Sequence, residues 1–326
     1  MSLARARQLT LVASVLLLLG VTVTVGHSFG AFTTTATNSG DTFATATDYR
    51  APTQNRSVIA KSAGGTPGFI KQGGTYFVYA DLTDTGNPAS GISTATSNNS
   101  SLTSLATSTA LASGSFSVGA LSYNRRSASQ TATASLTAGT YTYTVTSADV
   151  AGNSATQTYS VTVDNTVPTG SGIQTTNGGA NAGRPEQSDT ITYTFSEPID
   201  PNSVLAGWTG AVTNVVVRAN NNTPTNDQLL IFNSTNASQL PLGTVNLGRT
   251  DYTTANITFG ATGTASSMSM SGNSITVVLG TQSAAGTTAA ATGTMVWTPS
   301  ATATDRAGNA ETTTNVTESG TADKEF

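Results

Sequence analysis

Oxygen-bearing side chains recur in this sequence at one fixed spacing. The motif Asp-x-Ala-Gly-Asn occurs at 149–153 and again at 305–309. Carboxylate and amide oxygens are the ligands that a hard cation such as Ca²⁺ prefers, although the spacing does not match an EF-hand loop. Three more acidic residues stand near the first copy or the junction that follows it. The candidate calcium ligands are therefore Asp81, Asp84, Asp149, Asn153 and Asp164.

The same motif also predicts a tight hairpin turn. Its glycine can take a positive φ, and its Asp and Asn side chains can bond nearby backbone N–H groups. Eight residues before each Asp stands an aromatic residue, Tyr141 in the first copy and Trp297 in the second. We expect both aromatics to face a core. Two copies of one hairpin unit indicate two tandem modules.

Three other carboxylates and a tryptophan suggest chemistry on sugars. Glu197 and Asp200, with Glu186 nearby in the chain, could act as the acid and base of a glycosidase. Because Glu197 and Asp200 lie three residues apart beside two prolines, they are more typical of a tight surface turn. Trp208 could stack on a sugar ring or belong to the core. A carbohydrate-binding module and a carboxylate-based glycosidase are thus the alternatives to a structural protein.

The first 31 residues have the pattern of an export signal. Arg5 and Arg7 precede an apolar run over 9–25, which small residues follow. The segment Phe29-Gly-Ala-Phe32, with Thr-Phe-Ala at 42–44, resembles the processing region of exported biofilm-fibre subunits and camelysin-like proteins. That resemblance implies cleavage between Ala31 and Phe32. An ordinary signal peptidase could instead cut after Gly26.

Composition removes several classes of function. The chain has no Cys and one His, His27, which lies within the predicted signal. The processed chain would then lack a Ser-His-Asp triad, a Cys nucleophile, a His/Cys zinc site and a His- or Cys-ligated haem. It would carry 11 basic against 17 acidic residues, or −6, because only Arg5 and Arg7 leave. An acidic chain poor in Lys and Arg does not suit nucleic acid.

Hydrophobic periodicity predicts an all-β protein. Apolar residues alternate with Thr or Ser over 139–146, 156–163 and 190–195, which is the period of a half-buried strand. Glycine-rich turns separate such runs, and no segment has a sustained helical stripe. The stretches 262–271 and 282–292 are the most loop-like. We therefore expect two tandem immunoglobulin-like β-sandwiches after an N-terminal signal peptide.

The modules resemble bacterial immunoglobulin-like domains. The residues that carry this likeness are the two Asp-x-Ala-Gly-Asn motifs and Val163-Asp-Asn-Thr-Val-Pro168. The segment 195–204 makes the second module similar to Ig-like domains of S-layer and surface proteins. The expected organisation is a signal peptide over 1–31, an extended segment and linker over 32–57, Ig-like domain 1 over 58–165, a connector over 166–171, Ig-like domain 2 with insertions over 172–318 and a tail over 319–326.

Such a protein is expected to be non-enzymatic and extracellular. Ig-like domains of this kind serve as spacers, adhesive tips and lattice elements, so fold alone does not choose between adhesion, extracellular matrix and surface-layer roles. The expected partners are other surface or matrix proteins, further copies of the chain or a carbohydrate, with membrane contact only through an uncleaved signal. No cofactor is expected besides possible calcium. The strip Phe32–Ala46 could add as a strand to a neighbouring subunit.

Overall fold

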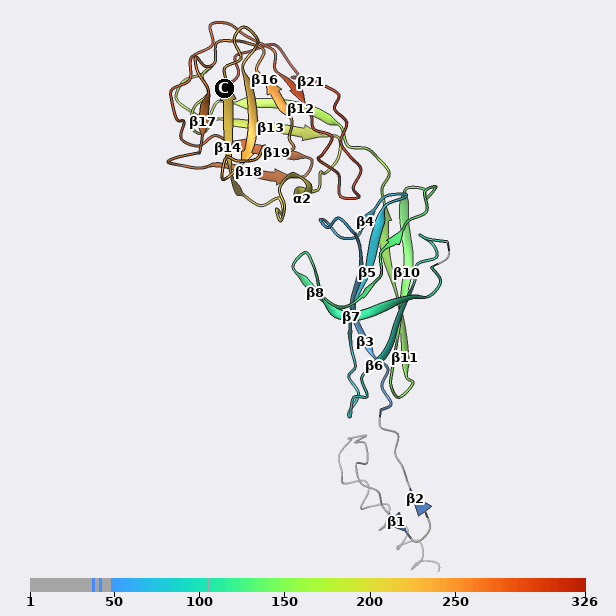
Figure 1. Cartoon of the computed structure of the whole chain (residues 1–326). Coiled ribbons are helices and arrows are strands. Elements are labelled where there is room, and N and C mark those ends of the chain that lie inside the picture. Colours follow the sequence, from blue (N-terminus) through green and yellow to red (C-terminus); the bar gives the residue numbers. More distant parts are fainter. Residues whose placement is uncertain (1–36, 39–40, 43–47, 105) are drawn as a thin grey trace, which may run out of the picture.

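The computed structural model describes residues 37–38, 41–42, 48–104 and 106–326. These residues form two β-domains joined by a short connector (Figure 1). Ahead of them, β1 (Thr37–Asn38) pairs with β2 (Asp41–Thr42). The predicted signal peptide and the Ala31–Phe32 cleavage site lie outside the described residues. Within the described part of the chain, no helix has the length and apolar character needed to cross a membrane.

Domain 1 is a sandwich of two layers, whose strands pair antiparallel except for β4, which pairs parallel with β11. One layer holds β3 (Thr53–Lys61), β5 (Thr75–Thr83), β8 (Leu121–Ser127) and β7 (Thr109–Val118), with β9 (Gln130–Thr131) beside β5. The other holds β6 (Ile92–Asn98), β10 (Gly139–Asp149), β11 (Ser154–Val163) and β4 (Phe69–Ile70). Strand β7 joins the layers, because its first residues pair with β6 and the rest with β8.

The core of domain 1 follows from the predicted alternation. Tyr143 and Val145 of β10 point inward together with Val161 of β11, while the hydroxyl residues between them face outward. Tyr141 is half-buried and packs against the edge of this core. A β-branched or aromatic residue at every second position thus supplies one wall of the sandwich.

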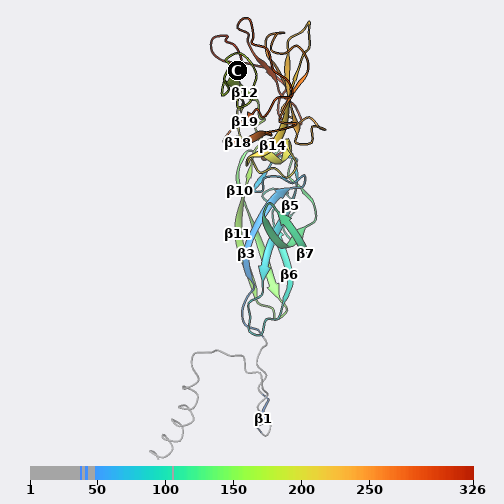
Figure 2. The ribbon, with the colours of Figure 1, turned by 90° about the vertical axis from the view of Figure 1, so that its left-hand side faces the viewer.

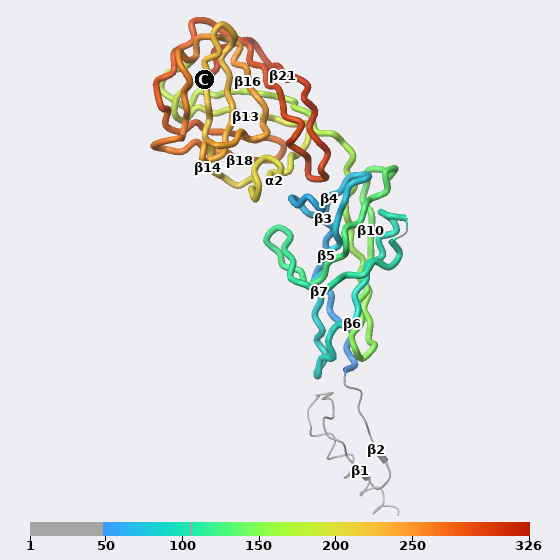
Figure 3. The backbone as a smooth tube through the Cα atoms, in the orientation of Figure 1, coloured from blue at the N-terminus to red at the C-terminus, as the bar shows by residue number. Residues whose placement is uncertain are grey.

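The β7–β8 hairpin extends sideways from domain 1 (Figure 3). Its Phe116 and Tyr123 pack on Tyr79 of β5, which forms a small second apolar cluster. The guanidinium of Arg126 lies 4.4 Å from the centre of the Phe116 ring and 4.6 Å from that of Phe77. A cation above two aromatic faces helps to fasten the hairpin to the sheet.

Domain 2 is a larger sandwich of the same kind. One layer holds β12 (Gly170–Thr176), β13 (Thr190–Phe195), β19 (Ser274–Val278) and β18 (Ser266–Ser271). The other holds β14 (Thr213–Asn220), β15 (Gln228–Asn233), β16 (Thr244–Asn246), β20 (Val296–Thr298) and β21 (Val316–Thr317), with β17 (Ile257–Phe259) beside β14. Pairing of β14 with β18 joins the layers, and β12 contacts β21 on the other side.

Both tryptophans belong to the interior of domain 2. Trp297 is fully buried, and its ring meets those of Tyr193 and Phe195 edge-on at 5.2 Å. Its indole N–H donates to the Leu242 carbonyl at 2.6 Å, which satisfies the one polar group of the ring. Trp208 is 7% exposed. The predicted core position of Trp297 is therefore confirmed, and the core alternative holds for Trp208.

The all-β fold is confirmed, but several boundaries differ from expectation. Strand β3 begins at Thr53, inside the segment predicted to be a linker. Strand β18 occupies part of the stretch predicted as a loop, because Met268 is buried between outward-facing serines. Pro299, which has no N–H to donate, follows β20 and ends it after three residues. Phe326, at the end of the segment expected to be a tail, is buried in the core of domain 2.

Glu311 makes the stability of domain 2 fall as pH rises from acid to about 8. It is 3% exposed, neither side-chain oxygen has a hydrogen-bond partner, and burial raises its pKa to about 8. Because the unfolded chain loses this proton near pH 4.5 and the folded chain near pH 8, the free energy of unfolding falls as pH rises between them. We expect Glu311→Gln to reduce this fall by on the order of 1–3 kcal/mol, since the amide stays buried but uncharged.

Urea unfolding at pH 5 and pH 8.5, followed by tryptophan fluorescence, measures this effect. Both tryptophans of the chain lie in domain 2, so that the signal reports this domain. Asp251→Asn is the control, because Arg249 already holds the pKa of Asp251 at about 2. An unchanged fall in the Glu311 variant would contradict the assignment.

Candidate functional site

The two Asp-x-Ala-Gly-Asn motifs form the same turn. The Asp149 N–H donates to the Asn153 carbonyl at 3.0 Å, and the Asp305 N–H donates to the Asn309 carbonyl at 3.0 Å. Each Asp carboxylate in return accepts the backbone N–H of its Asn, at 2.8 Å and 2.7 Å. The intervening glycines have φ of +95° and +94°, a conformation that L side chains rarely adopt. The predicted hairpin turn is confirmed in both copies.

The asparagine of each turn also holds the segment that enters its domain. The Asn153 amide donates to the Asp48 carbonyl at 3.2 Å, and the Asn309 amide donates to the Asp164 carbonyl at 2.9 Å. Each amide also donates to the Asp side chain of its own turn at 2.8 Å. The entry pole, which is the end where the chain enters the domain, is therefore built alike in the two domains.

Each entry pole gathers three carboxylates. Residues in corresponding places supply them: the entering segment, the loop after the strand that pairs with the first one (β5 or β13), and the turn itself. In each group, one oxygen from every residue lies within 4.8 Å of the others. The pole cluster of domain 1 is Asp48, Asp84 and Asp149, and the junction cluster of domain 2 is Asp164, Glu197 and Asp305.

The predicted calcium ligands are divided between several places. Asp84, Asp149 and Asn153 meet at the pole cluster, where Asp48 joins them. Asp81 instead forms an ion pair with Arg56 at 3.0 Å, across the β3–β5 pair. Asp164 follows β11 and belongs to the junction cluster. Sequence reasoning missed Asp48, because its contact with the turn spans about a hundred residues of chain.

The carboxylates of the pole cluster are engaged by backbone donors. Asp48 accepts the N–H groups of Arg50 at 2.9 Å and Ser90 at 3.0 Å. These bonds, that of Arg50 first, hold the pKa of Asp48 below its usual range. Asp84 accepts the N–H groups of Gly86 and Gly91. The three carboxylates thus organise loops whether or not an ion is bound.

The junction cluster contains a carboxylate oxygen whose hydrogen bonding is unsatisfied. Glu197 Oε1 is buried without a hydrogen-bond partner. Burial, followed by the nearby charges of Asp164 and Asp305, raises the pKa of Glu197 to about 7. A carboxylate in this position is costly unless a proton or a cation neutralises it. Of the two clusters, the junction cluster therefore fits a hard cation better.

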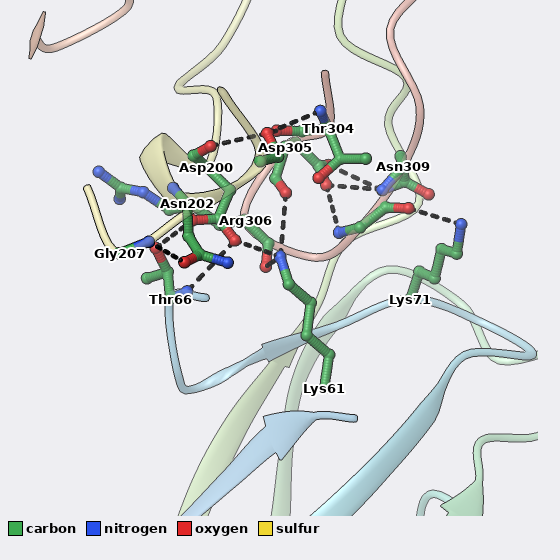
Figure 4. Close-up of polar contacts among 12 residues, drawn as sticks. Lys61, Thr66, Lys71, Asp200, Asn202, Gly207, Thr304, Asp305, Arg306 and Asn309 are labelled. Atoms are coloured by element: carbon green, nitrogen blue, oxygen red, sulfur yellow. Dashed lines mark hydrogen bonds and ion pairs between the residues drawn. The ribbon is translucent and has the colours of Figure 1, made fainter. Parts of the chain in front are cut away.

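Basic side chains of domain 1 reach into the same turn of domain 2 (Figure 4). Lys61 Nζ lies 2.5 Å from Asp200 Oδ2 and donates to the Arg306 carbonyl at 2.9 Å. Lys71 Nζ donates to the Gly308 carbonyl at 2.6 Å. The side chains of Lys61 and Asp200 are 11% and 2% exposed. The junction between the domains is thus closed by a buried ion pair and by lysines on turn carbonyls.

The carboxylates proposed for sugar hydrolysis have structural partners. Asp200 pairs with Lys61 and caps α2 (Pro201–Val204) by accepting the Asn202 N–H at 3.2 Å. Glu186 accepts from Arg184 at 2.7 Å, and Arg184 and then Asn181 lower its pKa to about 2. Glu197 instead belongs to the junction cluster. Asp200 therefore serves in an ion pair and as a helix cap, and Glu186 stabilises its loop.

Comparison with known proteins bears on domain 1. Residues 80–165 match the family model of the bacterial Ig-like domain. This match runs from β5 to the end of β11 and includes the Asp149–Asn153 turn, and bacterial Ig-like domains commonly occur in extracellular or surface proteins. No curated protein matches the chain. The predicted Ig-like nature is confirmed for this segment, whereas the S-layer similarity of domain 2 and the resemblance of the signal stay predictions.

Removing the Lys61 cation should weaken the junction. In Lys61→Met, Asp200 keeps its bonds from Thr66 and Asn202 but loses its counter-ion. We expect the free energy of unfolding of domain 2 to fall by about 1–3 kcal/mol, below the cost of breaking a fully buried pair. Urea unfolding followed by tryptophan fluorescence measures this fall.

A matched control removes one positive charge at a place far from the junction. Arg125→Met removes a cation from β8 of domain 1, where the guanidinium contacts the Asn124 carbonyl. Its tryptophan-detected transition should equal that of the wild type. Equal transitions for Lys61→Met and wild type would mean that the ion pair does not couple the domains.

Proposed function

We propose that the protein is a non-enzymatic, secreted or cell-surface bacterial protein, whose two Ig-like domains form a stiff spacer in adhesion, extracellular matrix or a surface layer. The observation that carries this proposal is the end-to-end junction closed by Lys61 and Asp200. The two views of Figures 1 and 2 agree that domain 2 sits at one end of domain 1. The chain enters domain 1 at the other end, through Asp48.

The connector supports a stiff joint because its backbone is bonded along its length. The Asp164 carbonyl accepts from Asn309, and the Pro168 carbonyl accepts from the Thr312 N–H at 3.0 Å. The Thr169 carbonyl accepts from the Ser196 N–H at 2.8 Å. A linker whose carbonyls are held by the following domain has little freedom to swing. Tension along the chain would therefore pass from one sandwich into the next.

The features that favour a sugar-active protein are weak by comparison. Trp208 presents little surface to solvent, because it is buried and its indole N–H donates to the Ala211 carbonyl at 2.6 Å. The carboxylates Glu186 and Asp200 are held by Arg184 and Lys61. Buried aromatic rings and neutralised carboxylates support the structural function over carbohydrate binding or hydrolysis.

Fractionation of the source bacterium tests this function. We expect the chain, cleaved between Ala31 and Phe32, in the extracellular or surface fraction, and we expect small-angle scattering of the purified protein to give an elongated particle. Detection only in the cytoplasm would overturn the proposal. Hydrolysis of a polysaccharide that is lost in Glu197→Gln would favour the glycosidase, and a Trp208 fluorescence change with glycans would favour the carbohydrate-binding module.

A second proposal is that the junction cluster binds Ca²⁺. The unpartnered Glu197 oxygen and its two carboxylate neighbours supply hard oxygen ligands within the reach of one ion. Such an ion would neutralise the cluster and strengthen the contact between the domains.

Calorimetric titration with Ca²⁺ tests the junction cluster. We expect Glu197→Gln to lose one binding site or to weaken it at least tenfold, because the neutral amide is a poorer ligand than the carboxylate. Asp251→Asn, which removes a carboxylate paired with Arg249 outside the cluster, should keep every site. Identical titrations of the wild type and the Glu197 variant would rule out this site.

A further inference from the structure

A third group of carboxylates lies away from the junction, where the chain returns after β21. Glu318, Asp323 and Glu325 each offer an oxygen, and these oxygens lie within 4.8 Å of one another. The returning segment is tied down on both sides. Glu318 accepts the Met295 N–H at 3.1 Å, and the Thr175 hydroxyl of β12 donates to Glu325 at 2.6 Å.

Glu325 is the unusual member of this C-terminal cluster. The residue is fully buried, and its Oε1 has no hydrogen-bond partner. Its Oε2 accepts from Thr175, while the charged groups that face it are the carboxylates of Glu318 and Asp323. A buried carboxylate beside two others is expensive, since desolvation and like-charge repulsion both oppose its ionisation. Either a proton on Glu325, which Glu318 can share, or a bound cation must therefore neutralise the cluster, because the facing carboxylates bring no positive charge.

We propose that Glu318, Asp323 and Glu325 bind a hard divalent cation of the Ca²⁺ type, which fastens the end of the described chain to domain 2. The donor set supports this choice of ion. Hard divalent cations prefer carboxylate oxygens, and Ca²⁺ accepts them in a flexible geometry, whereas Mg²⁺ demands a nearly ideal octahedron of ligands. This site is separate from the junction cluster and does not depend on it.

The ion would hold the buried Phe326 side chain in place. The Glu325 N–H donates to the Tyr252 hydroxyl at 2.7 Å, and the Phe326 ring meets that of Tyr252 edge-on at 6.2 Å. Phe326 is buried in the core of domain 2. A cation on Glu325 would thus couple ion binding to the packing of a core aromatic residue, and it would stabilise the folded domain by mass action.

Terbium luminescence tests the site in the full chain. Tb³⁺ serves as the probe for a calcium-type site, and Tyr252 lies beside the cluster as an energy donor. We expect saturable Tb³⁺ emission on tyrosine excitation, which Ca²⁺ displaces. Tyr252→Phe should lower the emission by a larger factor than it weakens Ca²⁺ binding measured by calorimetry, because it removes the energy donor but no carboxylate ligand. Absence of saturable emission would overturn the proposal.

Two substitutions and two control variants show which cluster binds the emitting Tb³⁺ ion. Glu325→Gln and Asp323→Asn should each weaken Tb³⁺ binding at least tenfold, and Asp323 is exposed, so its variant should keep the fold. Glu311→Gln, at another buried glutamate of domain 2, and Glu197→Gln, at the junction cluster, should leave the emission unchanged. Equal emission in the Asp323 and Glu325 variants and in the wild type would overturn the site, and loss in Glu197→Gln alone would assign the ion to the junction.

Discussion

The asparagine side chain at the end of each Asp-x-Ala-Gly-Asn turn is the contact on which both domains depend. Its amide bonds the turn aspartate on one side and the carbonyl of the entering segment on the other. The last hairpin of each sandwich is thereby tied to the segment that leads into its first strand, across more than a hundred residues in each domain. In domain 2 the same turn also offers its backbone carbonyls to Lys61 and Lys71, so that one local motif orients the domain and receives its neighbour.

Charge is scarce in this protein, and much of it is used at these places. Charged residues make up 9% of the chain, yet carboxylates gather at both entry poles and at the returning C-terminal segment. A buried ion pair such as Lys61–Asp200 adds little net stability compared with apolar packing, because both charges must be desolvated. Its effect is to specify one geometry, since Asp200 left without Lys61 would be a buried, uncompensated charge. The pair thus selects how the two domains meet.

The sequence predicts the local features of this fold well and the long-range ones poorly. The alternation over 190–195 predicts β13 with its observed bounds, and the glycines of the two turns have the positive φ expected of them. Strand β18 escapes prediction because serine and methionine are weak β-formers, and its register comes from pairing with β19. Lys61 ends a strand and reads as an ordinary solvated residue. Its partner Asp200 lies 139 positions later, and no local pattern connects the two.

The lysines that close the junction belong to one end of domain 1, and this makes the architecture directional. After the first strand of domain 2, the segment 177–189 contains no lysine, and its Arg184 is paired with Glu186. Domain 1, by contrast, carries both the lysines of an exit pole and an Asp-x-Ala-Gly-Asn turn at its entry pole. Gene duplication could therefore lengthen such an array by copying domain 1. Each copy would bring the two lysines at its exit pole and, at its entry pole, a turn that can receive the lysines of another copy. A copy of domain 2 would bring the turn but not these two lysines.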